Sequence, residues 1–290
     1  MTLKHQRQHL MQLFEAAVEA ANPLHCVPPA LPEPPQNGRL IILGAGKGAA
    51  AMVQAAEQHY LAGDAAVKLL GCAVTRTGFA SPAKAVEMLE AGHPVPTSAS
   101  VAAATRALGF ARGARDKDLV LVLLSGGASA LWTAPAKGVT LEEKQDVTRG
   151  LLASGARISE INCVRKHLST IKGGRLAHAA ARARLITLAI SDVPGDDPSA
   201  IGSGPTVGDP TTLADARQIL KDRTIACPAS IVTALSDESN ETPPPDDPLF
   251  VPSDYLLVSR PADALKAAAK LARTLAYDVQ VLGDSIEGEA

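Results

Sequence analysis

The sequence predicts an α/β protein, a three-layer α/β/α fold around a mostly parallel, Rossmann-like sheet. Short apolar runs with β-branched members alternate along the chain with segments whose apolar residues recur at helical spacing. Several of these runs end abruptly in glycine-rich or acidic turns, as strands of a parallel sheet do at the edge where ligands bind. We therefore expect a ligand site at the carboxyl ends of the strands.

The expected strands are the apolar runs, and residues 119–124, the most continuous of them, predict a central strand buried on both faces. All the expected strands lie at residues 40–43, 67–74, 86–89, 119–124, 185–190, 255–258 and 279–282.

The expected helices are amphipathic or alanine-rich, and several begin at a capping residue such as Thr140 or at a first-turn proline such as Pro261. They cover residues 2–21, 49–61, 98–112, 140–153, 159–183 with an interruption at Gly173-Gly174, 211–223, a segment after Pro228, and 261–276.

Two proline-rich stretches predict connections without regular structure. Residues 23–37 carry six prolines and predict an extended connector, and residues 239–248 predict a linker or exposed loop. We expect one α/β/α domain over residues 1–238. Residues 239–290 are then the linker and the start of a truncated C-terminal α/β domain.

Composition excludes several classes of function. The net charge is −2 and only 3% of residues are aromatic, which argues against a nucleic-acid surface. The four cysteines lie far apart without a Cys-x-x-Cys pair, so we expect a reducing, cytoplasmic location and neither a zinc site nor a disulfide framework. No apolar run is long enough to predict a membrane-spanning helix.

The turn after the first expected strand contains Gly44, Gly46 and Lys47. It fits Gly-x-Gly-x-x-Ala, a permissive dinucleotide fingerprint, but no acidic residue ends the second strand to bind a ribose hydroxyl. Lys47 stands in the first turn of a helix, where a cation opposes the helix dipole. It indicates a bound anion, and the alternative is a solvated surface lysine.

A second glycine turn, with Ser125, Gly126, Gly127 and Ser129, follows the expected strand at residues 119–124. Consecutive backbone N–H groups that are not covered by side chains favour the binding of a phosphate or a carboxylate group. The alternative is a tight turn that merely requires small residues.

A cationic segment follows in the interrupted helix. Four cations, Arg165, Lys166, Lys172 and Arg175, could face one side and neutralise a polyphosphate, and Gly173 and Gly174 place open backbone beside that charge. A charge run is more commonly a solvated face, so both interpretations stay open.

Three carboxylates, Asp192, Asp196 and Asp197, follow the strand at residues 185–190 in a loop stiffened by prolines. They predict a site for a cation or a charged substrate, against the alternative of a surface loop. Glycine-rich anion cradles, carboxylates and mobile cations are together the parts that phosphoryl transfer needs.

Five motifs in order resemble bacterial glycerate 2-kinases of the MOFRL type, many of which carry an older label of hydroxypyruvate reductase from tartrate catabolism. The motifs are Gly44-Ala-Gly-Lys-Gly48, Gly92-His-Pro-Val-Pro96, Leu124-Ser-Gly-Gly-Ala-Ser-Ala-Leu131, Val164-Arg-Lys-His-Leu-Ser169 with Lys172-Gly-Gly-Arg-Leu-Ala177, and Ser191-Asp-Val-Pro-Gly-Asp-Asp-Pro-Ser199 with Gly202-Ser-Gly-Pro-Thr206.

The resemblance implies transfer of phosphate from ATP, with Mg²⁺, to the 2-hydroxyl of D-glycerate. It implies that Lys47 and Asp192 are catalytic, with Lys47 on the phosphates and Asp192 on Mg²⁺ or the attacking hydroxyl. Asp196 is the second expected metal ligand. Members of the family continue into a C-terminal domain that supplies an essential arginine, so we expect little kinase activity from this chain alone.

Two other functions stay open. The fingerprint at Gly44 and the older label favour an NAD(P)H-dependent hydroxypyruvate reductase, although the ribose-binding acid is missing. A binding scaffold without activity is the third possibility. The expected partners are the small-molecule substrate and a nucleotide, with no nucleic acid and no membrane, and a homodimer is left open.

Overall fold

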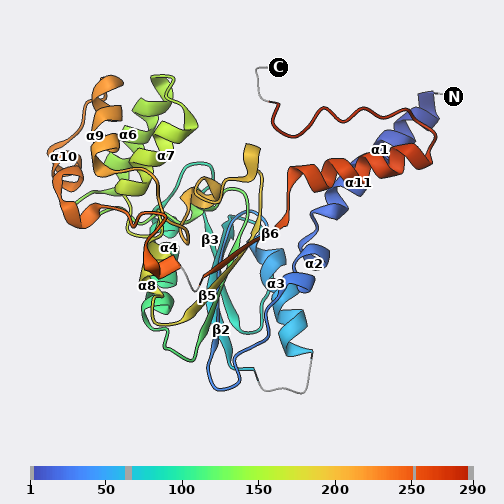
Figure 1. The fold of residues 1–290 in the computed structure, drawn as a ribbon, viewed down its shortest axis with the longest axis horizontal. Coiled ribbons are helices and arrows are strands. Elements are labelled where there is room, and N and C mark those ends of the chain that lie inside the picture. Colours follow the sequence, from blue (N-terminus) through green and yellow to red (C-terminus); the bar gives the residue numbers. More distant parts are fainter. Residues whose placement is uncertain (1–2, 63–66, 251–252, 287–290) are drawn as a thin grey trace.

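The computed structural model describes residues 3–62, 67–250 and 253–286. Its centre is a sheet of six parallel strands in the order β3-β2-β1-β4-β5-β6 (Figure 1). The strands are β1 (Leu40–Ala45), β2 (Leu69–Arg76), β3 (Val86–Ala91), β4 (Leu119–Leu124), β5 (Arg184–Ile190) and β6 (Asp254–Ser259). This strand order is that of a doubly wound Rossmann sheet, in which ligands bind where the order reverses, between β1 and β4.

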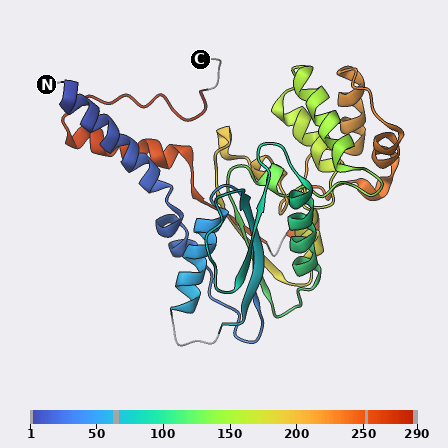
Figure 2. The ribbon, with the colours of Figure 1, turned by 180° about the vertical axis from the view of Figure 1, so that it is seen from behind.

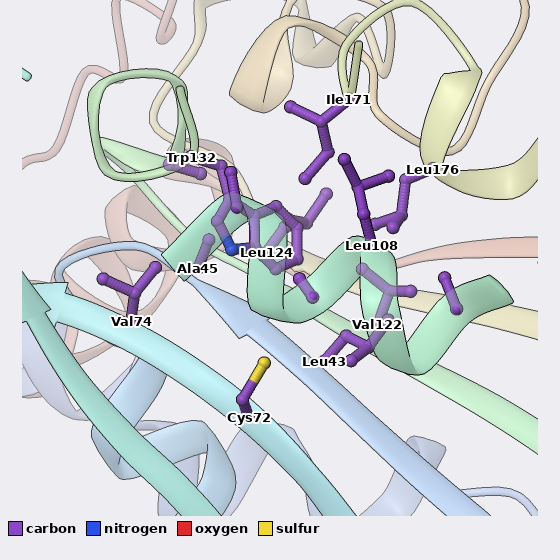
Figure 3. Packing of buried hydrophobic residues seen from close by; sticks show 14 of the residues in the cluster. Leu43, Ala45, Cys72, Val74, Leu108, Val122, Leu124, Trp132, Ile171 and Leu176 are labelled. Atoms are coloured by element: carbon purple, nitrogen blue, oxygen red, sulfur yellow. The ribbon is translucent and has the colours of Figure 1, made fainter. Parts of the chain in front are cut away.

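Side chains of β1 show how the two faces of the sheet are filled. Leu40 and Ile42 belong to the core on one face, which helix α3 (Ala49–Leu61) covers. Ile41 and Leu43 belong to the opposite core, because successive residues of a strand point to opposite faces. That opposite core lies under α4 (Ser98–Arg112), α5 (Ala128–Leu131) and α8 (Arg175–Ala179). Figure 3 shows its packing around Leu43, Val122, Leu108 and Trp132.

Four further helices form a separate cluster beyond the carboxyl ends of the strands (Figure 2). They are α6 (Leu141–Ala153), α7 (Ile158–His167), α9 (Leu213–Asp222) and α10 (Ala229–Ser236), and they enclose a core of their own. Helix α6 begins with the predicted capping box, in which Glu143 N donates to Thr140 Oγ1 at 3.1 Å and Thr140 N donates to Glu143 Oε2 at 2.8 Å.

The first and last long helices, α1 (Leu3–Ala20) and α11 (Pro261–Thr274), lie side by side (Figures 1 and 2). The phenol of Tyr277, just after α11, forms a 2.9 Å hydrogen bond with His9 Nδ1. Helix α1 packs against α11, but none of its residues is buried. In the described residues no helix is both long and apolar enough to cross a bilayer.

The predicted fold class is confirmed, and six of the predicted strands are present. The strand predicted at residues 279–282 is wrong, because these residues have no regular structure and Leu282 is 70% exposed. After β6, helix α11 leads the chain away from the sheet (Figure 1). Residues 279–282 therefore do not lie beside β6 and cannot pair with it.

The two proline-rich stretches are more ordered than predicted. The first contains α2 (Pro23–Cys26), capped by the Asn22 side chain, and the 3₁₀ helix η1 (Pro28–Ala30). Residues 239–248 are not simply exposed, since Thr242 is 4% exposed and its hydroxyl donates to Asp209. The other 3₁₀ helices are η2 (Pro194–Asp196), η3 (Ile201–Ser203), η4 (Glu238–Asn240) and η5 (Pro248–Phe250). Strand β6 belongs to the same sheet as β1–β5, and the domain division after residue 238 stays a prediction.

Candidate functional site

The turns after β1 and β4 lie against each other at the point where the strand order reverses. Lys47 N donates to Gly126 O at 2.8 Å, and Gly48 N donates to Ser125 Oγ at 2.9 Å. Ser125 is therefore buried and occupied in joining the two turns. This arrangement fixes the backbone of both predicted anion-binding loops.

Glycine is required in the first turn because the two turns approach so closely. Gly46 has φ 137°, and a Cβ atom on it would lie 2.1 Å from Ser125 Oγ. A Cβ on Gly44 would lie 2.8 Å from the Cβ of Ala73 in the neighbouring strand. Gly44, Gly46 and Ser125 thus build the site, and their predicted contact with a ligand stays a prediction.

Lys47, His93 and Asp192 converge on the two glycines of the second turn. A Cβ built on Gly126 would lie 2.1 Å from Asp192 Oδ2. One built on Gly127 would lie 2.9 Å from His93 Nε2 and 3.4 Å from Lys47 Cε. Residues that follow β1, β3, β4 and β5 therefore meet in one place, as expected for the carboxyl edge of a parallel sheet.

The charged groups of this cluster have unused binding capacity. Lys47 and Asp192 are exposed, and neither side chain forms a hydrogen bond or ion pair with any described residue. The backbone N–H groups of Gly126 and Gly127 have no acceptor among the described residues either. An ammonium group, a carboxylate and two adjacent amides are thus free to bind a ligand.

His93 was not predicted as a site residue. Burial lowers the pKa of its imidazole, the nearby charges of Lys47 and Arg76 lower it further, and Asp192 opposes them. These effects favour the neutral form of the His93 imidazole. His93 lies just after β3, as Lys47 and Asp192 lie just after β1 and β5. A polar residue at the carboxyl end of a strand is therefore the sequence signal that indicates all three residues.

The metal-binding prediction concerns Asp192 and Asp196. Asp196 has φ 55° and a buried Oδ1 atom without a hydrogen-bond partner, as expected of a carboxylate that lacks its ligand. The part of the chain that the structure describes contains no group of three metal-ligating side chains. These carboxylates fit Mg²⁺, which proteins commonly hold with one or two carboxylates together with substrate phosphates. They do not fit a metal site in which the protein supplies every ligand.

The structure does not bring Lys172, Gly173 and Gly174 into the cluster around Lys47, and their predicted contact with a ligand stays a prediction. Lys172 is 1% exposed, and its Nζ donates to Ser129 O at 2.8 Å and to Ser129 Oγ at 3.1 Å. Gly173 N and Gly174 N donate to Ser203 O and Gly204 O. The ammonium group and both N–H groups therefore have acceptors within the protein, and the contact of Lys172 with Ser129 helps to hold the turn at residues 125–129 in place.

Arg165 lies apart from the cluster around Lys47. It lines a cleft of about 320 Å³ between α6 and the turn after β3. Neither Lys47 nor Asp192 nor any residue of the turn at 125–129 lines this cleft. Arg165 and Lys172 do not share one surface, because Lys172 is buried against Ser129, and their contact with a polyphosphate stays a prediction.

The chain is similar in sequence and in fold to known proteins. A structure of glycerate kinase from Thermotoga maritima superposes with a TM-score of 0.83 at 33% identity, over 96% of this chain and 65% of that chain. A glycerate 2-kinase of Pyrococcus horikoshii is 39% identical over 260 residues, which are 88% of this chain and 57% of that protein.

A protein of Agrobacterium vitis, whose name proposes a hydroxypyruvate reductase, is 49% identical over 284 residues, 98% of this chain and 63% of its own length. This chain thus spans less than two thirds of the length of these relatives. The family described as "Domain of unknown function (DUF4147)" matches residues 9–236. Since that match covers most of the chain, the protein belongs to the DUF4147 family.

Proposed function

We propose that this chain carries the nucleotide- and substrate-binding part of a kinase that transfers phosphate from ATP to the 2-hydroxyl of D-glycerate. The observation that supports it best is the convergence of Lys47 and Asp192 on Gly126 and Gly127, with all four free to bind. The names of the Thermotoga and Pyrococcus relatives point to the same activity.

Each group of the cluster has a place in this reaction. Lys47 places a positive charge where the transferred phosphoryl group accumulates negative charge, and the N–H groups of Gly126 and Gly127 donate to its oxygens. Asp192 orients the attacking hydroxyl or, with Asp196, holds Mg²⁺, which neutralises charge on the phosphates when bound.

The second candidate is an NAD(P)H-dependent hydroxypyruvate reductase, which the name of the Agrobacterium relative favours. The structure offers no carboxylate at the end of β2, where Val74, Thr75 and Arg76 stand. The guanidinium of Arg76 instead stacks on Phe79, with 3.5 Å between it and the ring centroid. A ribose 2′-hydroxyl would have no acidic partner there, which disfavours NADH.

The test compares both reactions on the purified chain. ADP release is followed with D-glycerate and Mg-ATP, and NADPH absorbance is followed with hydroxypyruvate. Calorimetry of Mg-ADP and D-glycerate binding accompanies both assays, because a chain with low turnover still reports binding. We expect Mg-ADP to bind, and to bind at least tenfold more weakly to Lys47→Met. NADPH oxidation together with silent nucleotide titrations would overturn the kinase assignment.

A further inference from the structure

The cleft beside α6 is lined by two kinds of side chain. Apolar groups of Val95, Leu141 and Leu152 form one part of the wall, and Val95 and Leu152 are 62% and 63% exposed. Three cations, Lys144, Arg149 and Arg165, form the other part, and no carboxylate lines the cleft. The cleft therefore joins an apolar surface to an uncompensated positive charge.

Two of the three cations already have partners. The Nζ of Lys144 donates to the carbonyl oxygens of Arg165, at 2.9 Å, and of Leu168. Arg149 forms an ion pair with Asp146 at 2.9 Å. The guanidinium of Arg165 forms no hydrogen bond or ion pair with any residue that the structure describes.

The surroundings of Arg165 make this isolation costly. Burial lowers the pKa of Arg165, and no nearby carboxylate opposes that effect. Burial also lowers the pKa of Lys144 and of Lys172, and the charge of Arg165 lowers both further. A partly desolvated cation without a counter-ion is unfavourable, and an anion beside the Arg165 guanidinium would offset that penalty.

We propose that this cleft is a second anion site, in which Arg165 binds the carboxylate of a small organic acid and the apolar wall contacts its hydrocarbon part. The planar fork of a guanidinium matches a carboxylate in two parallel hydrogen bonds. A volume of about 320 Å³ suits a small organic molecule and exceeds the needs of a bare inorganic ion. The inference does not depend on the proposed kinase activity.

The occupant would lie next to the turn that carries His93. Pro94, Val95 and Pro96 line the cleft, and Gln145 of α6 donates to Pro96 O at 2.7 Å across it. An acid bound here would therefore contact the residues that directly follow His93. Because neither Lys47 nor Asp192 lines the cleft, it is distinct from the cluster around Lys47.

The test measures thermal stabilisation by isovalerate, with isoamyl alcohol as the uncharged probe of similar shape and inorganic phosphate as the anion without hydrocarbon. We expect isovalerate to raise the Tm of the wild-type chain and the alcohol and phosphate to do so much less. Arg165→Met should bind isovalerate at least tenfold more weakly. In carboxylate-free buffer it should melt no lower than the wild type, because it removes a partly buried, unpaired charge.

Two variants serve as controls. Arg217→Met, in the same helical cluster, replaces an arginine that donates to Leu235 O, and it should keep the full isovalerate shift. Lys47→Met should keep it as well, because Lys47 lies outside the cleft. The proposal is overturned if Arg165→Met keeps the shift, if Lys47→Met loses it, if phosphate or the alcohol matches isovalerate, or if the wild type does not respond.

Discussion

The molecule contains two lysine–aspartate sets that differ in their surroundings. Lys166 and Asp209 form a 3.0 Å ion pair in the helical cluster, and their side chains are 4% and 0% exposed. Lys47 and Asp192 meet at the carboxyl edge of the sheet, where both are exposed and have no partner among the described residues. The same residue types are structural in one place and available to a ligand in the other.

The buried pair is part of a closed network. Asp209 also accepts hydrogen bonds from the hydroxyl groups of Thr211, at 2.8 Å, and Thr242, at 3.1 Å. His167 is fully buried beside it, with its two ring nitrogens in hydrogen-bond contact with Cys163 O and the carboxylate of Glu241. Each of these polar side chains has at least one hydrogen-bond partner within the protein, unlike Lys47 and Asp192. Unused donors and acceptors, and not charge alone, mark the candidate active site.

The largest expected effect comes from opening the buried pair. Asp209→Asn leaves the ammonium of Lys166 without its counter-ion in the interior, which should lower the free energy of unfolding by about 3–5 kcal/mol. Urea denaturation followed by circular dichroism measures it. The double variant Lys166→Met/Asp209→Asn should recover part of the loss, and a single variant as stable as the wild type would contradict the structural role.

Lys47→Met should show the opposite behaviour. Because Lys47 is exposed and unpaired, its loss should change the free energy of unfolding by no more than about 0.5 kcal/mol. Binding of Mg-ADP should weaken by at least a factor of about 10, equivalent to about 1.4 kcal/mol. Calorimetry on the same preparation measures both the stability and the binding of Mg-ADP. A variant that is destabilised but binds Mg-ADP normally would contradict both expectations.

Gly127→Ala separates backbone strain from disturbance of the site. Gly127 has φ 86°, and the new methyl group would lie 2.9 Å from His93 and 3.4 Å from Lys47. Gly138 has nearly the same φ, 82°, and a Cβ there meets nothing within 4 Å. Both alanine variants should lose about 1 kcal/mol of stability from the left-handed backbone. Only Gly127→Ala should weaken nucleotide binding, and equal binding by the two variants would argue against a ligand at this turn.

The smallest effect is expected at a surface ion pair of the helical cluster. Hydrogen bonds from Arg223, at 2.7 and 3.1 Å, and from Arg157 lower the pKa of Glu160 from 4.5 to about 2. A carboxylate whose pKa falls on folding stabilises the fold above its unfolded pKa and loses that contribution as the pH falls toward 2. Arg223→Met should therefore be less stable than the wild type near neutral pH and should approach it in acid. Urea denaturation at several pH values checks this convergence.

The sequence predicted the sheet well because each strand is a short apolar run followed at once by a polar or glycine-rich turn. The run at residues 279–282 has the same local pattern but no neighbour to pair with, and pairing is a tertiary property that a local pattern does not contain. The site was predictable at Lys47 and Asp192 by the same reasoning, since each directly follows a strand.

Lys172 shows where that reasoning stops. In sequence, Lys172-Gly-Gly places a lysine beside glycines as the first glycine turn does, yet the Lys172 ammonium is buried against Ser129. Whether a lysine faces water or a carbonyl oxygen depends on how α7 and α8 pack against the 125–129 turn, which is a long-range contact. The predicted contact of Arg165 with a polyphosphate stays a prediction, and the cleft that Arg165 lines forms only when α6 packs against the turn that carries His93.

The pairing of α1 with α11 sets a limit on the order of folding during synthesis. Helix α1 is synthesised before its packing partner α11, which emerges only after β6, the last strand of the described sheet. Until then α1 has no α11 to pack against, whereas Leu10, Met11 and Phe14 remain 60–70% exposed even in the folded structure. This segment is therefore made before the sheet but reaches its native place only after the last strand of the sheet has been made.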